Sequence, residues 1–254
     1  MSDLAISLLT LGLVFGGALV GHAISIRLPH HHLQEDSRDV VKVAVGLTAT
    51  LSAVLLSLLI ASAKNFYDAQ TMEVEQLAGK VVLLDRVLAH YGPETGEIRK
   101  EFQKSIAAAI DRIWPTERGV GGDLSIPRQR GAAEAFFTGI LELSPRTDAQ
   151  KLAQVQAIQI SVSLGEIRML MFSQRGNMVP SIFIAILLIW VVALFLGFGL
   201  LTRINPTVVT VLFVGATLIA SAVFLILELN HPYEGMIQIP STVMRDALAQ
   251  MGRS

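Results

Sequence analysis

The most constraining feature of this sequence is the run of residues 43–63, which carries no charged side chain and is flanked by Lys42 and Lys64. A helix of about 20 apolar residues is long enough to cross the hydrocarbon core of a bilayer. Three further runs have the same character: 4–26, 181–201 and 207–227. Only 16% of the 254 residues are charged, whereas a soluble domain usually carries about a quarter. The sequence therefore predicts a membrane protein with four spans.

The spans divide the chain into four parts. Residues 1–63 hold the first two transmembrane helices, 64–179 form a polar insert, 180–229 hold the last two, and 230–254 form a tail. Apolar residues of the insert recur with a helical period, and no sustained strand alternation is present. We therefore expect an all-α fold, a membrane protein with four transmembrane helices and a helical cytoplasmic insert between the second and third.

The second span is expected to continue as a helix to about His90, where Gly92 and Pro93 end it. Its apolar residues in the insert share one face: Leu77, Val81, Leu84 and Leu88. Further helices are expected at about 93–114, 128–143 and 148–175, with a short amphipathic helix in the tail. In the first of these helices, four side chains point inward: Phe102, Ile106, Ile110 and Ile113. The helix at 148–175 includes Leu152, Val155, Ile158, Val162 and Met169.

Small and hydroxylated residues share one face of the second span: Gly46, Thr50, Ala53, Ser57 and Ala61. Lipid would select bulky apolar groups on every side. One explanation is close helix–helix packing, which small residues permit inside a membrane. The other is a water-lined conduit, in which these residues line a pore and the hydroxyls of Thr50 and Ser57 face the permeating species. This stripe alone leaves both explanations open. In the first span, the pairs Gly12–Gly16 and Gly17–Gly21 favour packing.

We find no catalytic motif in the chain: no phosphate-binding glycine loop, no His-Glu-x-x-His and no nucleophile elbow. We therefore predict no enzyme activity, no cofactor and no catalytic residue. His30, His31 and His32 lie beside several carboxylates, but consecutive side chains on a short connection rarely converge on one ion. We predict a solvated connection there and no metal site. The chain has no cysteine and a net charge of −1, which gives no indication of nucleic-acid binding.

Four spans would place the N-terminus, the insert and the C-terminus on one side of the membrane. Basic residues near the spans are balanced between the two sides, so they do not set the orientation. The absence of an export signal and of cysteines favours the cytoplasm for the insert. We expect a multi-pass protein of the cell (inner) membrane with both termini in the cytoplasm.

Four stretches carry a resemblance to a known family: HHHLQEDSRDVVKVAVGL from His30, LSAVLLSLLIASAKNFYDAQ from Leu51, LLDRVLAHYGPE from Leu83 and ELNHPYEGMI from Glu228. With the order two spans, helical insert, two spans, the chain resembles the bestrophin-like domain family over nearly its whole length. True bestrophins are oligomeric anion channels whose second span lines the pore. The resemblance implies that role for Gly46, Thr50, Ala53 and Ser57.

We therefore expect a homo-oligomeric channel, with further copies of itself, the lipid bilayer and small inorganic ions as its partners. Charges are expected at the pore mouths: Lys42, Lys64, Asp68 and Glu228. The lysines favour anions, whereas the two carboxylates oppose them. Two other hypotheses stay open. The first is a structural or signalling membrane protein, and the second is a membrane enzyme or transporter that uses His22, Glu228 and His231.

Overall fold

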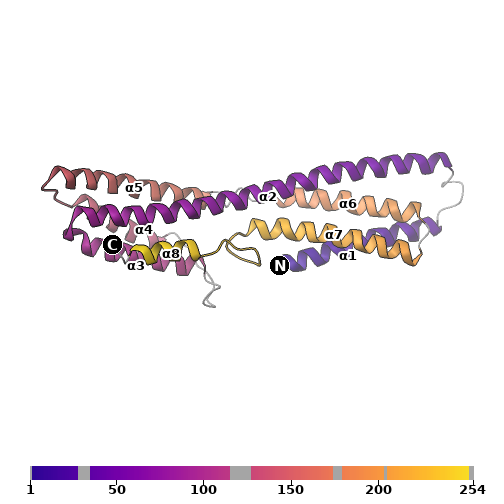
Figure 1. The fold of residues 1–254 in the computed structure, drawn as a ribbon. Coiled ribbons are helices and arrows are strands. Elements are labelled where there is room, and N and C mark those ends of the chain that lie inside the picture. The colour runs from indigo at the N-terminus through magenta and orange to yellow at the C-terminus, as the bar shows by residue number, and fades with distance from the viewer. Residues whose placement is uncertain (1, 28–34, 115–126, 174–178, 203–204, 252–254) are drawn as a thin grey trace. The chain divides into compact units, whose positions relative to one another are not determined.

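The computed structural model describes residues 2–27, 35–114, 127–173, 179–202 and 205–251. Within these ranges the regular elements are helices and no strand is present, which confirms the all-α prediction. In chain order they are α1 (Asp3–Arg27), α2 (Glu35–Tyr91), the 3-10 helix η2 (Pro93–Thr95), α3 (Gly96–Ile113), α4 (Pro127–Leu141), α5 (Asp148–Ser173), α6 (Ser181–Leu201), α7 (Pro206–Asn230) and α8 (Thr242–Met251) (Figure 1). By length and composition, α1, α2, α6 and α7 suffice to cross a membrane.

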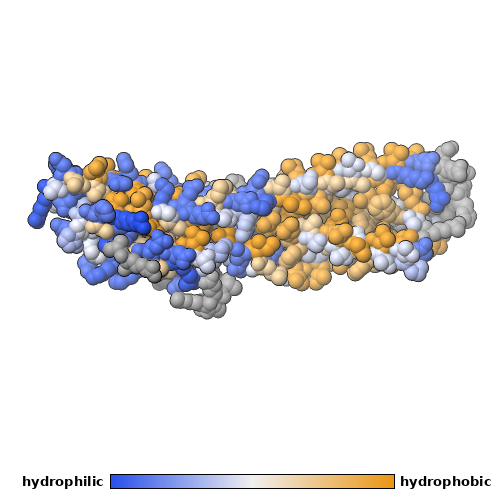
Figure 2. Space-filling view, viewed as in Figure 1, coloured by the Kyte–Doolittle hydropathy of each residue, from blue (hydrophilic) through white to orange (hydrophobic). Residues whose placement is uncertain are grey.

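The chain forms two compact units. The first, the span unit, comprises residues 1–67 and 177–231. The second, the insert unit, comprises residues 68–176 and 232–254. Helix α2 contributes residues to both. In the face shown by Figure 2, hydrophobic side chains cover most of the span unit, whereas hydrophilic side chains predominate on the insert unit. This contrast is the one expected when one unit is surrounded by lipid and the other by water.

The predicted continuation of the second span is confirmed, because α2 extends from Glu35 to Tyr91 without interruption. It ends where Gly92 adopts φ 138°, a backbone conformation that side chains disfavour. The hydroxyl of Thr95 then donates to the carbonyls of Leu88, at 2.6 Å, and Gly92, at 2.9 Å. These bonds satisfy carbonyls that a helix end leaves without partners. The chain thus turns from α2 into α3 while the carbonyls of Leu88 and Gly92 keep hydrogen-bond partners.

Glycines bring α1 and α6 into close contact in the span unit. A Cβ added to Gly21 would overlap the backbone of Leu196, and one added to Gly199 would overlap the backbone of Ala18 and His22. Gly17 faces Val192 in the same contact. Close approach of two backbones is the use that membrane helices make of small residues. The packing predicted for Gly17 and Gly21 is therefore confirmed.

Helix α7 completes the span unit. It packs against α1, and Phe15 of α1 meets Phe213 of α7 edge to face, with ring centroids 5.5 Å apart. The start of α7 is fixed by Asn205, whose side-chain oxygen accepts from Val208 N at 2.8 Å. Asparagine is among the best residues for this capping role, and Pro206 suits the first helical position.

The insert unit has its own hydrophobic core. Side chains from α2, α3, α4, α5 and α8 meet in it, and its buried members include Val81, Leu84, Leu88, Phe102, Ile140, Ala157, Ile160 and Met251. The rings of Phe102 and Phe136 stack with centroids 4.6 Å apart. Burial of each large apolar side chain stabilises such a core by about 1.5–3 kcal/mol. The inward face predicted for the second half of α2 is confirmed by this cluster.

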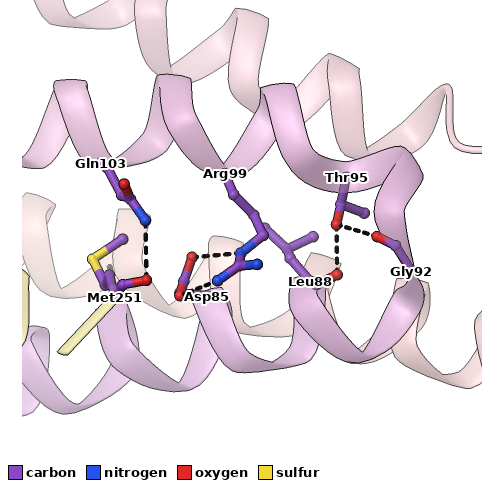
Figure 3. A network of polar contacts seen from close by, with 7 residues as sticks. All are labelled: Asp85, Leu88, Gly92, Thr95, Arg99, Gln103 and Met251. Atoms are coloured by element: carbon purple, nitrogen blue, oxygen red, sulfur yellow. Dashed lines mark hydrogen bonds and ion pairs between the residues drawn. The ribbon is translucent and has the colours of Figure 1, made fainter. Parts of the chain in front are cut away.

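A buried ion pair joins α2 to α3 within the insert unit (Figure 3). Arg99 donates from Nε to Asp85 Oδ1 at 2.9 Å and from Nη2 to Asp85 Oδ2 at 2.8 Å. The Asp85 side chain is 1% exposed. These hydrogen bonds raise the pKa of Arg99 above its ordinary value. Because a buried charge without its partner costs several kcal/mol, the pair fixes which face of α3 meets α2.

The C-terminal segment is anchored to the insert unit by side-chain hydrogen bonds. Trp114 Nε1 donates to the Ile239 carbonyl at 2.7 Å, and the hydroxyl of Tyr233 donates to Gln70 Oε1 at 2.9 Å. Gln103 Nε2 donates to the Met251 carbonyl at 3.1 Å, at the end of α8 (Figure 3). The short tail helix predicted from the sequence is present as α8, and the tail belongs to the fold of the insert unit.

Candidate pore-lining face

The small-residue stripe of α2 is open in the single chain. All five of its members are exposed: Gly46, Thr50, Ala53, Ser57 and Ala61. The opposite side of the same helix is buried, with Ser52 at 5% exposure, Leu59 at 4% and Ala63 at 0%. Packing of the stripe against another helix of the same chain is therefore not the explanation for its composition. Water, lipid or a second copy of the chain must cover it.

The exposed half of α2 has two distinct edges. The stripe forms one of them. Bulky apolar side chains form the other: Leu47, Leu51, Val54 and Leu58, each between 48% and 63% exposed. Residues three and four apart on a helix lie on the same side, so the two sets follow parallel paths along the helix surface. We call them the small edge and the bulky edge of α2. Contact with lipid alone does not explain why small and bulky residues occupy separate edges of α2.

The hydroxyl groups of the small edge are bonded to their own helix. Thr50 Oγ1 donates to the Gly46 carbonyl at 3.1 Å, and Ser57 Oγ donates to the Val54 carbonyl at 2.9 Å. Each oxygen therefore presents its lone pairs outward. A hydroxyl can rotate to suit its partner, so it can accept from water or, after rotation, donate to an anion. The edge can therefore coordinate either sign of charge at the cost of one weak backbone bond.

Charged residues continue the spacing of the small edge at both of its ends. Lys42 lies four residues before Gly46, and Lys64 lies three residues after Ala61. Lys42 is exposed and pairs with Asp39 at 2.8 Å, and Lys64 is exposed in the span unit. Asp68, four residues further, is partly buried. Two lysines at the ends of an uncharged helix face would attract anions, and the nearby carboxylates moderate that field.

Glu228, which the sequence suggested as a fourth charge at the pore mouth, lies inside the span unit at 4% exposure. Its neighbour Asn230 is also 4% exposed, and Asn230 Oδ1 accepts from Val179 N at 3.5 Å. Close to it, His231 Nδ1 lies 3.3 Å from Asp3 Oδ2 of α1. Glu228 is thus buried near the end of α7 in the single chain, and its place at a pore mouth stays a prediction.

The three residues considered for an enzyme or transporter are not brought together. His231 contacts Asp3 at the beginning of α1, whereas His22 lies 19 residues further along the same helix. At 1.5 Å per residue, this spacing corresponds to about 28 Å. His22 Nδ1 is buried without a hydrogen-bond partner among the described residues. A single site that uses both His22 and His231 is therefore incompatible with the fold.

A second exposed row of hydroxyls occurs on α7, at Thr210, Thr217 and Ser221. Thr217 Oγ1 donates to the Phe213 carbonyl at 2.9 Å, as Thr50 does in α2. Large apolar side chains are exposed next to this row, including Val214 at 51% and Leu218 at 65%. The α7 row lacks the glycine and alanines that make the small edge of α2 narrow. It therefore resembles a lipid-facing surface with internally bonded hydroxyls.

No group of three or more potential metal-binding side chains is present among the described residues. His30, His31 and His32 lie outside the described residues. The functional candidates of this chain are therefore surfaces of helices, and the small edge of α2 is the one whose composition is least explained by contacts within the chain.

Comparison with known proteins places this architecture in a family. The family model of the Bestrophin-like domain matches residues 12–244. Comparison with the curated proteins finds no match. Among solved structures, the chain is similar to a variant of a bacterial bestrophin homologue from Klebsiella pneumoniae, with 15% identity, a TM-score of 0.58 and 99% of each chain covered. A structure described only as a membrane protein is similar over 96% of this chain and 98% of its own, at 13% identity and a TM-score of 0.58. Since the family model spans most of the sequence, the chain belongs to the bestrophin-like domain family.

Proposed function

We propose that this protein is a homo-oligomeric ion channel of the cell membrane, in which the small edge of α2 from each copy surrounds a central water-filled path. The observation that carries the proposal is the exposure of that edge in an otherwise apolar span. Over an apolar stretch of 18 residues in each span, 11% of the residues are buried in α2, against 33% in α1, 28% in α6 and 22% in α7. The span that the single chain encloses least is thus the one that carries the small edge.

Two features support a path for anions. Lys42 and Lys64 continue the small edge at its two ends, and rings of basic side chains favour anions in pores. The hydroxyls of Thr50 and Ser57 can rotate from their backbone bonds to donate to an anion. In this arrangement the insert unit lies in the cytoplasm.

The test is ion flux through the purified protein in lipid vesicles. Vesicles of a neutral lipid, loaded with a halide-sensitive dye, should report halide entry faster than empty vesicles prepared in parallel. The same preparation is assayed with potassium as the permeant ion to establish the sign of the charge that passes. The absence of flux above empty vesicles, across the pH and divalent-cation conditions tried, would leave a structural or signalling membrane protein as the better description.

A further inference from the structure

Two arginines of the insert unit differ from the other basic residues on their helices. Helices α3 and α5 carry six basic side chains, and four of these form ion pairs with carboxylates: Arg99 with Asp85, Lys100 with Glu97, Lys104 with Glu101 and Lys151 with Asp148. The other two are Arg112, near the end of α3, and Arg168, near the end of α5. No ion pair joins either of them to a carboxylate of the described residues.

The levels of α3 and α5 are both fixed by hydrogen bonds to α2. The two bonds from Arg99 to Asp85 set the level of α3. Gln150 Nε2 donates to the Tyr91 carbonyl at 3.1 Å, which sets the level of α5. Both helices run antiparallel to α2 (Figure 1). Residues of α3 and α5 that lie at the same height can therefore be found by counting from these bonds, because all three helices have the same rise per residue.

This count places Arg112 and Arg168 at one level. Positions 85 and 91 of α2 are six residues apart, so position 99 of α3 is level with about position 156 of α5. Arg112 lies 13 residues beyond the first and Arg168 lies 12 beyond the second, a difference of about 1.5 Å in height. Desolvation by the surrounding protein lowers the pKa of Arg168, and the charge of Arg112 lowers it further. The two guanidinium groups thus repel each other across the end of the bundle.

The two arginines lie at the end of the insert unit where the chain passes to the span unit. These passages follow residues 67, 176 and 231. The bond from the Tyr233 hydroxyl to Gln70 joins the first passage to the third. Trp114, two residues after Arg112, meets Tyr233 edge to face with ring centroids 5.9 Å apart. Arg168 lies eight residues before the second passage. We call this the membrane-side end of the insert unit, because the span unit is the one that crosses the bilayer.

The chemistry of the pair suits an anion with several oxygens. Arg112 is partly buried, and its Nε donates to the Ala108 carbonyl at 3.1 Å, which holds the guanidinium in place. Its Nη atoms have no hydrogen-bond partner among the described residues, and Arg168 is exposed. Guanidinium groups bind phosphate oxygens through paired, charge-assisted hydrogen bonds. Next to a membrane, phosphate groups are carried by lipid headgroups, and basic side chains beside the spans attract the anionic ones.

We propose that Arg112 and Arg168 together bind the phosphate group of an anionic lipid headgroup at the membrane-side end of the insert unit. The phosphate supplies the counter-charge that the protein itself does not provide to this pair. It also removes the repulsion between the two guanidinium groups, so the bound lipid stabilises the folded chain. The site goes beyond the proposed ion path, because it requires no conduction and uses no residue of the small edge.

The test is ligand-dependent thermal unfolding of the purified full chain in a neutral detergent. Short-chain phosphatidic acid is titrated into the protein, and the melting temperature is followed as a function of its concentration. A ligand that binds the folded state raises this temperature, and we expect a rise of a few degrees. Phosphatidylcholine of the same chain length, which carries no net charge, should leave the temperature unchanged. Inorganic phosphate at the same concentrations shows whether the lipid part is needed.

Three variants assign the effect to the pair. Arg112→Gln and Arg168→Gln should each weaken the apparent affinity for phosphatidic acid about tenfold, because each removes charge-assisted hydrogen bonds. The double variant should show no rise. Arg146→Gln is the matched control, since Arg146 is an exposed arginine two residues before the other end of α5. Without lipid, both single variants should melt at or above the temperature of the native protein, because each relieves the repulsion between like charges.

Each contrary result has a definite meaning. Equal rises in the native protein and the double variant, or an equal rise with phosphatidylcholine, would overturn the site. Loss of affinity in only one of the single variants would overturn the pairing of the two arginines. If inorganic phosphate alone gave the full rise and the double variant lost it, the assignment to lipid would be overturned in favour of free phosphate. None of these results depends on ion flux, so this proposal and the channel proposal can fail separately.

Discussion

Two small-residue faces in the span unit look alike in sequence and differ in structure. On α1, Gly17 and Gly21 lie against α6 so closely that a side chain at Gly21 would overlap the backbone of Leu196. On α2, the small edge from Gly46 to Ala61 faces away from the rest of the chain. The first face is closed by another backbone, and the second is open. Small residues in an apolar span therefore indicate either dry packing or a surface reserved for something outside the chain.

The same contrast occurs within α1 itself. Gly12 and Gly16 have the spacing of Gly17 and Gly21, and the sequence predicted packing for both pairs. A Cβ added to Gly12 or Gly16 meets nothing within 4 Å. No helix of the described part of the chain packs against this pair, so packing stays a prediction there. The reason is rotational, since successive residues on a helix are about 100° apart and only one of the two pairs faces α6.

The largest effect is expected at the closed face. Gly21→Val places a branched side chain where the backbone of Leu196 lies, so α1 and α6 must separate. Overpacking of this kind costs about 1–3 kcal/mol and more when backbone atoms are involved. We expect most of the folded protein to be lost, measured as the yield of monodisperse protein after detergent extraction. Gly16→Val is the matched control, and equal losses in both variants would contradict the distinction between the two pairs.

The next effect is expected at the open face. Thr50→Leu and Ser57→Leu replace hydroxyls with bulky apolar groups, which should narrow and dry a pore. We expect halide flux to fall at least tenfold, equivalent to about 1.4 kcal/mol on the barrier. Yield and native mass should not change, because both positions are exposed in the single chain.

Thr217→Leu on α7 provides the matched control for these variants. Thr217 is also exposed and bonded to its own helix, but it lies on the surface that resembles a lipid-facing one. Flux should remain near that of the native protein. Reduced flux in Thr217→Leu with normal flux in Thr50→Leu would assign the path to α7 and contradict our choice of helix.

A smaller change is expected from the charges at the ends of the small edge. Lys64→Gln removes one positive charge per copy from the mouth of the proposed path. An exposed unit charge interacts with a nearby ion by about 1 kcal/mol in water, so the anion-to-cation permeability ratio should fall a few-fold. Reversal potentials in a salt gradient measure this ratio. An unchanged ratio would place Lys64 away from the path, and Lys80→Gln in the insert unit serves as the control.

The smallest effect is expected from Gly12→Ala. The added methyl group meets nothing within the chain, and alanine is favoured over glycine in a helix by about 1 kcal/mol. Thermal stability in detergent should therefore stay the same or rise slightly. A clear loss of stability or of oligomeric mass would show that a second copy covers Gly12 and Gly16. Both glycine pairs of α1 would then be packing faces, one within the chain and one between copies.

Much of the fold could be predicted because helix signals in this chain are strong and local. The uninterrupted α2, its end near Gly92-Pro93, and the inward row at Val81, Leu84 and Leu88 all follow from spacing and from the chemistry of glycine and proline. The ion pair between Asp85 and Arg99 could not be predicted in this way. It joins two helices across a turn, and neither residue differs in sequence from the exposed charges around it.

The amino-acid sequence was enough to identify a helical membrane protein, the residues that share each helical face, and the family to which the chain belongs. Which of those faces are closed and which are open depends on how the helices pack in three dimensions. Helical periodicity sets the direction of each side chain relative to its own axis, but the neighbour on that side depends on where the other helices pack. For this reason the structure was needed to show that Gly21 lies against the backbone of Leu196 and that Glu228 is buried. It was also needed to show that the small edge of α2 is exposed.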